Sequence, residues 1–584
     1  MKFCPTKFQS IAQCFLLAFL CIGPRLCLAL DREAFTFTNY DLNLQIEPEQ
    51  HRLGVRGKIS LRNDSPSPQK IAVLQITSSL DWRAIKAGDK SLQFVTQPYT
   101  SDIDHTGSLS EAIVTLSQAV PARETIELDI AYEGVILPDA TRLTRIGAPP
   151  DVVKSTDWDQ IDPSFSAMRG AGYVAWYPIA TDVANLSETG SLFEVLGRWK
   201  AREAGSKMHL RVTSTQGEED SRQIVFEGLP CTPTGSAAGQ VQADCPVQAL
   251  GLSVPAVVVA DYQALERTAI TVRFLKGHDD AAAKFADAAE TTAPLIADWF
   301  GSPRQKASVN DLPDPTAAPF ESGALLLTPL AAADEKLSGL AAAHQLTHAT
   351  FLSFRPWIEE GLAHFAQALY LEQQKGRQAA LDYMGLHRTA LVQIEQPDTG
   401  PRSDEEAGRA LVSTTNEELY RSKAMCVWWM LRDMIGDAAL KKALASYRPE
   451  QDNDRSYMAR LISAQTQRDL AWFFDDWVYH DRGLPEFKVE SAFSRKATTD
   501  TFMVTVTIDN VGTAVAEVPL RVKFAGGEVA RRVEVRGKNK AVIRVETPAA
   551  PEEIVVNDGS VPETNPGNNV FRVQPTGPSQ NTPP

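Results

Sequence analysis

The chain has no excess of positive charge, and this absence removes several classes of function. Its 584 residues include 58 lysines and arginines against 73 aspartates and glutamates, a formal net charge of −15. A negative chain is repelled by the phosphates of nucleic acids and by anionic membrane surfaces. The composition therefore predicts no nucleic-acid partner, whereas a peptide or protein ligand remains compatible with it.

Long apolar runs are absent after the N-terminal segment. Residues 1–29 combine Lys2 and Lys7 with a short apolar run and end at the small residue Ala29, a pattern typical of a secretory signal peptide. An uncleaved membrane anchor is the alternative, although the run is short for a bilayer. We expect a periplasmic or extracellular protein with no stable membrane span after the signal is removed.

Cysteine is scarce outside this segment. Four of the seven cysteines lie within residues 1–29, which leaves Cys231, Cys245 and Cys426. In an exported protein, Cys231 and Cys245 can form a disulfide around a small loop, and zinc ligation by the pair is the alternative. Cys426 lies in an apolar helical run, where we expect a buried thiol.

Hydrophobic periodicity divides the remaining chain into three domains. Residues 30–265 alternate between apolar and polar side chains, which predicts an antiparallel β domain. Residues 266–485 are mainly helical, with helices expected at 279–300, 336–351 and 356–374. Residues 486–576 return to short alternating strands typical of an immunoglobulin-like β-sandwich, and residues 577–584 are expected to form a disordered tail. The expected fold class is multidomain α+β.

A candidate metal site lies in the helical domain. His344 and His348 are four residues apart and therefore share one face of a helix. Glu360 follows on the next helix, which restarts at Pro356 because proline suits the first helical turn. Two imidazoles and one carboxylate leave a fourth position open, as in catalytic zinc sites. Two packed histidines without a metal are the alternative.

Gln345 stands where a hydrolase of this pattern needs a general base. A glutamate at that position would accept a proton during hydrolysis, and an amide cannot. Glu359 is the nearest spare acid, but it lies about 100° around its helix from Glu360, and we expect it to be a solvated charge. The positions one and two turns after Glu360 are His364 and Gln367, so we expect no acidic residue to orient the histidines.

The segments 344–348 (H-Q-L-T-H) and 357–363 (W-I-E-E-G-L-A) resemble the signature of the aminopeptidase N family of gluzincin metallopeptidases. In that family the signature reads H-E-x-x-H, with a downstream glutamate in a W-x-x-E-G-[FL]-A segment. The resemblance implies a thermolysin-like gluzincin domain at residues 266–485, zinc as the cofactor, His344, His348 and Glu360 as its ligands, and peptide or protein substrates.

Two further segments fall in the order of the same family. Residues 319–325 resemble its exopeptidase motif, which implies that Glu321 binds the free amine of a substrate; an ordinary loop glutamate is the alternative. Residues 420–424 resemble the segment whose tyrosine stabilises the oxyanion, which implies that role for Tyr420; a packed helix-start tyrosine is the alternative.

Three functional interpretations follow from these residues. The first is an exported zinc aminopeptidase that lacks its usual base. The second is a catalytically silent relative that keeps the zinc and binds peptides, or serves as a scaffold. The third is an exported structural protein without a metal.

Overall fold

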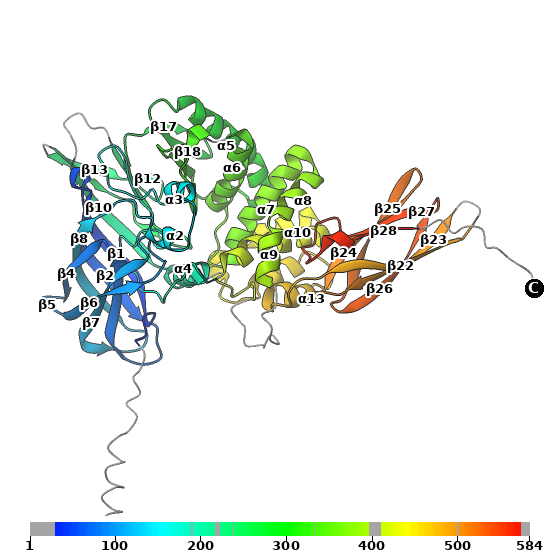
Figure 1. Cartoon of the computed structure of the whole chain (residues 1–584), viewed down its shortest axis with the longest axis horizontal. Coiled ribbons are helices and arrows are strands. Elements are labelled where there is room, and N and C mark those ends of the chain that lie inside the picture. The colour runs from blue at the N-terminus through cyan, green and yellow to red at the C-terminus, as the bar shows by residue number, and fades with distance from the viewer. Residues whose placement is uncertain are drawn as a thin grey trace, which may run out of the picture.

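The computed structural model describes residues 30–188, 191–215, 222–237, 239–332, 334–395, 410–498 and 501–573. In these residues the fold is mixed α+β, with several antiparallel sheets and 12 α-helices. N-terminal sheets, a helical region and C-terminal sheets follow one another along the long axis (Figure 1). The expected signal peptide and the expected disordered tail lie outside the described residues. None of the described helices is both long and apolar enough to cross a bilayer.

The N-terminal region is built around a nine-stranded sheet with the order β13-β14-β10-β1-β2-β8-β4-β5, and β15 pairs with β10. Tyr40, Leu42, Leu44 and Ile46 on β1 are buried while their neighbours are partly exposed, which confirms the period of two. One pair, β1 with β10, is parallel. The strands are β1 (Phe35–Glu47), β2 (Arg52–Asn63), β4 (Leu80–Ala87), β5 (Lys90–Ser91), β8 (Thr125–Val135), β10 (Lys207–Thr215), β13 (Thr232–Ala237), β14 (Gln240–Asp244) and β15 (Gln248–Ala249).

Two smaller sheets and three helices complete this region. Cys231 and Cys245 form a disulfide that joins the start of β13 to the end of β14. The first small sheet contains β3 (Gln69–Thr77), β7 (Ser108–Val120) and β6 (Gln93–Thr100), and the second contains β12 (Leu229–Pro230), β11 (Gln223–Phe226), β16 (Val257–Ala260) and β9 (Ser166–Met168). The helices are α2 (Thr141–Arg145), α3 (Pro150–Thr156) and α4 (Ser191–Glu203).

The helical region begins with a five-stranded sheet of order β17-β18-β19-β21-β20, in which β18, β19 and β21 are parallel and β20 forms one edge. Its strands are β17 (Gln263–Glu266), β18 (Ile270–Phe274), β19 (Ala307–Asp311), β20 (Phe320–Ser322) and β21 (Leu325–Thr328). The helices are α5 (Asp279–Phe300), α6 (Glu335–Thr350), α7 (Pro356–Lys375), α8 (Arg377–Leu386), α9 (Arg388–Glu395), α10 (Ala424–Ile435), α11 (Asp437–Ser446), α12 (Tyr457–Ser463) and α13 (Ala471–Phe474), with π-helical turns η3 (Leu419–Lys423) and η5 (Asp475–Tyr479).

Local sequence explains where the two central helices start and stop. The side chain of Asp334 accepts a hydrogen bond from the backbone N–H of Leu337 and so caps α6. Pro356 occupies the first turn of α7, and α7 ends at Lys375, where Gly376 follows with a φ of 86°. Gly361 lets α7 approach its neighbours, because a Cβ there would lie 2.6 Å from that of Ala424. This contact brings η3 and α10 against α7. The free thiol of Cys426 on α10 is buried, as expected.

The C-terminal region contains two antiparallel sheets with buried residues between them, including Val504, Val506, Leu520 and Val522. One sheet comprises β22 (Phe487–Lys496), β23 (Phe502–Asn510) and β26 (Asn539–Thr547), and the other comprises β25 (Gly527–Val535), β24 (Ala516–Phe524), β27 (Pro551–Val556) and β28 (Val570–Arg572).

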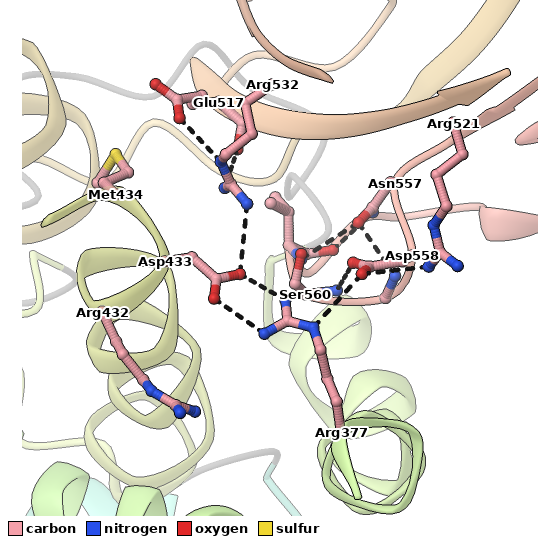
Figure 2. Close-up of polar contacts among 12 residues, drawn as sticks. Arg377, Arg432, Asp433, Met434, Glu517, Arg521, Arg532, Asn557, Asp558 and Ser560 are labelled. Carbon is pink, nitrogen blue, oxygen red and sulfur yellow. Dashed lines mark hydrogen bonds and ion pairs between the residues drawn. The ribbon is translucent and has the colours of Figure 1, made fainter. Parts of the chain in front are cut away.

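A network of ion pairs joins the helical region to these sheets, and we call it the junction network (Figure 2). Asp433 at the end of α10 pairs with Arg377 of α8 at 2.6 Å and with Arg532 of β25 at 3.4 Å. The remaining pairs are Arg532–Glu517 (2.8 Å), Arg468–Glu517, Arg377–Asp558 (3.6 Å) and Arg521–Asp558 (3.2 Å). Each of these charged side chains therefore reaches at least one opposite charge.

Candidate metal centre

Helices α6 and α7 bring His344, His348 and Glu360 together, with one ligand atom from each lying within 4.8 Å of the other two. The two Nε2 atoms of the histidines are 3.1 Å apart. Oε2 of Glu360 lies 3.9 Å from Nε2 of His344, and its Oε1 lies 3.9 Å from Nε2 of His348. The three predicted ligands thus converge, because four-residue spacing aligns the histidines and the short turn before Pro356 folds α7 back.

Unsatisfied buried polar atoms gather at the same place. Nδ1 of His344, Oε2 of Glu360, Nε of Arg421 and both ring nitrogens of His364 make no hydrogen bond to any described residue. Buried polar atoms without partners are rare in folded proteins and call for a ligand, an ion or ordered water. Zinc binds imidazole and carboxylate donors at about 2.0–2.2 Å, so two imidazole nitrogens 3.1 Å apart can share one ion. The donor set and its spacing therefore fit zinc.

Glu359 has a role that the sequence did not suggest. Only 8% of the surface of Glu359 is exposed. The expectation that it is a solvated charge was therefore wrong. Its Oε1 lies 3.2 Å from Nδ1 of His348, and its Oε2 accepts a hydrogen bond from the backbone N–H of Ser353 at 2.5 Å. The turn between α6 and α7 holds the carboxylate beside the ring. Glu359 is thus the acidic partner that orients a histidine, and the expectation that none exists was also wrong.

Electrostatics at the centre favour metal-binding forms of two ligands. Burial lowers the pKa of His344, which keeps the ring neutral and able to coordinate. Burial would raise the pKa of Glu360, but the positive charge of the Arg421 guanidinium, with further contributions from His348 and His344 when their rings are protonated, lowers that pKa well below its usual range. Neutral imidazole and ionised carboxylate are the forms that bind a metal.

Arg421 is a second residue that sequence reasoning missed. Its Nε lies 3.4 Å from Oε2 of Glu360, and its Nη1 lies 3.6 Å from Oε2 of Glu417. Glu417 in turn pairs with Lys200 of α4 at 3.0 Å. A chain of alternating charges therefore runs from the N-terminal region to a metal ligand. The sequence signal for Arg421 is its place next to Tyr420 in the segment that resembles the family motif.

Tyr420 lies on η3 and is 2% exposed. Burial and the neighbouring Glu417 carboxylate raise its pKa well above the usual value. The contact from η3 to Glu360 is made by Arg421 rather than by Tyr420. The role of Tyr420 at an oxyanion stays a prediction.

Gln345 is fully buried on the side of α6 that faces the β20–β21 hairpin. In the orientation that satisfies its carboxamide, the nitrogen donates to the carbonyl oxygens of Gly323 at 2.8 Å and Leu325 at 3.3 Å. A carboxylate cannot donate these hydrogen bonds. The amide therefore fits its surroundings and ties α6 to the edge of the central sheet.

Glu321 lies beside His344 but is not part of the three-residue donor cluster. It is on β20, its side chain is 33% exposed, and its Oε2 lies 3.4 Å from Nε2 of His344. A groove of about 350 Å³ runs alongside, and Ser322, Gly323, His348 and Glu360 are among the residues that line it. Residues 248–253 of the N-terminal region form another part of its lining.

The chain matches no protein-family model and no curated protein. The case for a metal centre therefore rests on the convergence of His344, His348 and Glu360 and on the buried polar atoms around them that lack hydrogen bonds.

Proposed function

We propose that this chain is an exported zinc-binding protein of the aminopeptidase N type that binds peptides but is severely impaired in cleaving them. The proposal assigns the helical region to a gluzincin domain and the C-terminal sheets to an immunoglobulin-like sandwich. The observation that carries it is the cluster of His344, His348 and Glu360 beside a groove. Export to the periplasm or the extracellular space is part of the proposal, from the N-terminal pattern.

The groove suits an extended peptide because β20 is an edge strand. Edge strands present backbone N–H and C=O groups that an added strand can pair with. Ser322 and Gly323, at the end of β20, line the groove together with the metal-site residues His348 and Glu360. A peptide lying along β20 would therefore pass the metal centre.

The chain's own residues support binding better than they support hydrolysis. Bound zinc would supply Lewis-acid polarisation of a peptide carbonyl. Glu359 holds the ring of His348, and Arg421 faces Glu360. Gln345 cannot accept a proton, and the loss of a general base reduces rates by a factor on the order of 10²–10⁴. We therefore place peptide binding ahead of turnover.

An active aminopeptidase is the second candidate, and the position of Glu321 favours it. Its carboxylate lies on the edge strand, 3.4 Å from Nε2 of His344. In the resemblance described above, this residue holds the free amine of a peptide.

Zinc content and peptide hydrolysis test the proposal together. Protein purified without chelators is expected to contain one zinc per chain, and His344→Ala less than about a tenth of that, because a zinc site needs its imidazole donors. Wild type is expected to cleave aminoacyl-aminomethylcoumarin substrates no faster than His344→Ala. Absence of zinc in wild type would overturn the proposal, and zinc-dependent hydrolysis would establish the second candidate instead.

A further inference from the structure

Glu321 is closer to a metal-binding nitrogen than the predicted carboxylate ligand is. Its Oε2 lies 3.4 Å from Nε2 of His344, whereas Oε2 of Glu360 lies 3.9 Å from that nitrogen. In a tetrahedral zinc site with bonds of about 2.0–2.1 Å, neighbouring donor atoms are about 3.3–3.4 Å apart. Glu321 therefore lies at the spacing of a metal donor from His344.

The strand fixes this position. Phe320 and Ser322 are buried, and the period of two along β20 turns Glu321 to the opposite face. The hydroxyl of Ser322 accepts a hydrogen bond from the N–H of Val254 and donates one to its carbonyl oxygen. Gln345 holds the following turn to α6 through the carbonyl oxygen of Gly323. These contacts fix the C-terminal end of the short strand, and the strand presents the carboxylate of Glu321 to His344.

Charge balance supports the same assignment. Arg421 lies 3.4 Å from Glu360, so the negative charge of that ligand is shared with a guanidinium. Among the described residues, no lysine or arginine nitrogen lies within ion-pair distance of Glu321, and the side chain beside its carboxylate is the neutral imidazole of His344. A dication held by two neutral imidazoles is best balanced by two carboxylates. Glu321 supplies the second negative charge.

We propose that Glu321 is a fourth protein donor to the metal, so that two histidines and two glutamates close the site. This inference rests on the metal binding proposed above. A closed set of four protein donors is the arrangement of structural zinc sites, whereas catalytic sites keep one position open. The substitution at Gln345 and the donor at Glu321 would then have the same consequence, which is a centre that binds metal and does not turn over.

Cobalt substitution tests the fourth donor directly. The mature chain is stripped with a chelator, loaded with Co²⁺ and examined by visible absorption before and after addition of excess azide. We expect an absorption spectrum typical of four-coordinate cobalt in wild type, unchanged by azide. In Glu321→Gln we expect an azide-dependent shift, together with a loss of Zn²⁺ affinity of at least a factor on the order of 10, since even residues that only support metal ligands contribute 10–100-fold.

Glu266→Gln is the matched control. This carboxylate belongs to the same central sheet but pairs with Lys306 at 2.8 Å, so the control is expected to keep the wild-type spectrum and affinity. Circular dichroism verifies that both variants are folded. If wild type binds Co²⁺ but responds to azide, or if Glu321→Gln behaves as wild type, Glu321 is not a donor while the metal site stands. If wild type binds neither ion, the proposed function itself fails.

Discussion

The metal centre and the junction network both place charged side chains between helices and neighbouring elements, but they differ in how those side chains are satisfied. In the junction network, Asp433, Glu517 and Asp558 each form ion pairs with two arginines, and all of these pairs except Arg468–Glu517 can be followed in Figure 2. At the metal centre, the side chains of His344, His348 and Glu360 converge, while Nδ1 of His344 and both ring nitrogens of His364 make no hydrogen bond to any described residue. Ion pairs that satisfy every charge indicate a structural connection, and convergent metal-type donors beside polar atoms that lack hydrogen bonds indicate a ligand.

This difference separates contributions to folding stability from contributions to ligand binding. The junction network contributes to stability through protein–protein contacts alone, so it is complete without any ligand. The metal centre is incomplete by itself, because a buried donor without a partner costs free energy until an ion binds. Substitutions in the junction network should therefore change the free energy of unfolding, and substitutions at the metal centre should change the affinity for zinc.

The largest effect is expected for Glu360→Ala, which removes the only predicted carboxylate ligand from the cluster. Zinc affinity should fall by more than a factor of about 100, as measured by competition with a chromophoric chelator. Stability of the metal-free protein should change by less than about 1 kcal/mol relative to metal-free wild type. Unchanged zinc affinity in Glu360→Ala would show that Glu360 does not bind the metal and that the two clusters do not differ in the way described.

Glu359→Gln should weaken zinc by a factor of about 10–100, because it removes the carboxylate beside Nδ1 of His348. The same chelator competition measures this loss. Glu372→Gln on the same helix is the control, since that carboxylate pairs with Arg432 instead. A loss of equal size in both variants would contradict the assigned role of Glu359.

Asp433→Ala should lower the stability that the junction network provides. It leaves Arg377 and Arg532 without a shared partner, and we expect a loss of about 1–3 kcal/mol in the free energy of unfolding. Urea unfolding measures it, and zinc affinity should remain that of wild type. Asp433→Asn keeps hydrogen-bond acceptance and should lose less. A drop in zinc affinity in Asp433→Ala would instead show that the junction network and the metal centre are energetically coupled, which contradicts the distinction between them.

The last effect concerns pH and is no larger than that expected for Asp433→Ala. Burial raises the pKa of Glu563 to about 7, although Asn569, Phe487 and Asn557 donate to it. Because the folded-state pKa is above the unfolded value, the stabilisation is fully present below about pH 4.5 and lost as pH rises through about 7. We expect a loss on the order of 1–3 kcal/mol between pH 5 and 8. Urea unfolding at a series of pH values measures this loss. In Glu563→Gln the free energy of unfolding should change less with pH than in wild type. The same change with pH in both proteins would contradict the role assigned to Glu563.

Local patterns in the sequence predicted the parts of the fold that depend on neighbouring residues. The helix expected at 279–300 coincides with α5, and those expected at 336–351 and 356–374 differ from α6 and α7 by one residue at the ends. The convergence of the three proposed ligands was predictable for the same reason, because their spacing and the intervening turn are local. The two-residue period of β1 was likewise visible in the sequence.

Contacts between distant segments could not be predicted in this way. Glu359 is next to Glu360, but its place beside His348 depends on the turn at Ser353. Arg421 reaches Glu360 from another helix, and Lys200 reaches Glu417 from the N-terminal region. The distance from Glu321 to His344 depends on the pairing of β20 with β21 and on its docking to α6. No spacing rule connects these residues.

Anomalous diffraction at the zinc absorption edge tests the central claim most directly. Crystals of the mature chain, grown without chelators, should show one strong anomalous peak between Nε2 of His344, Nε2 of His348 and the carboxylate of Glu360. A map with no peak there, and with Glu360 bonded only to Arg421, would contradict the account.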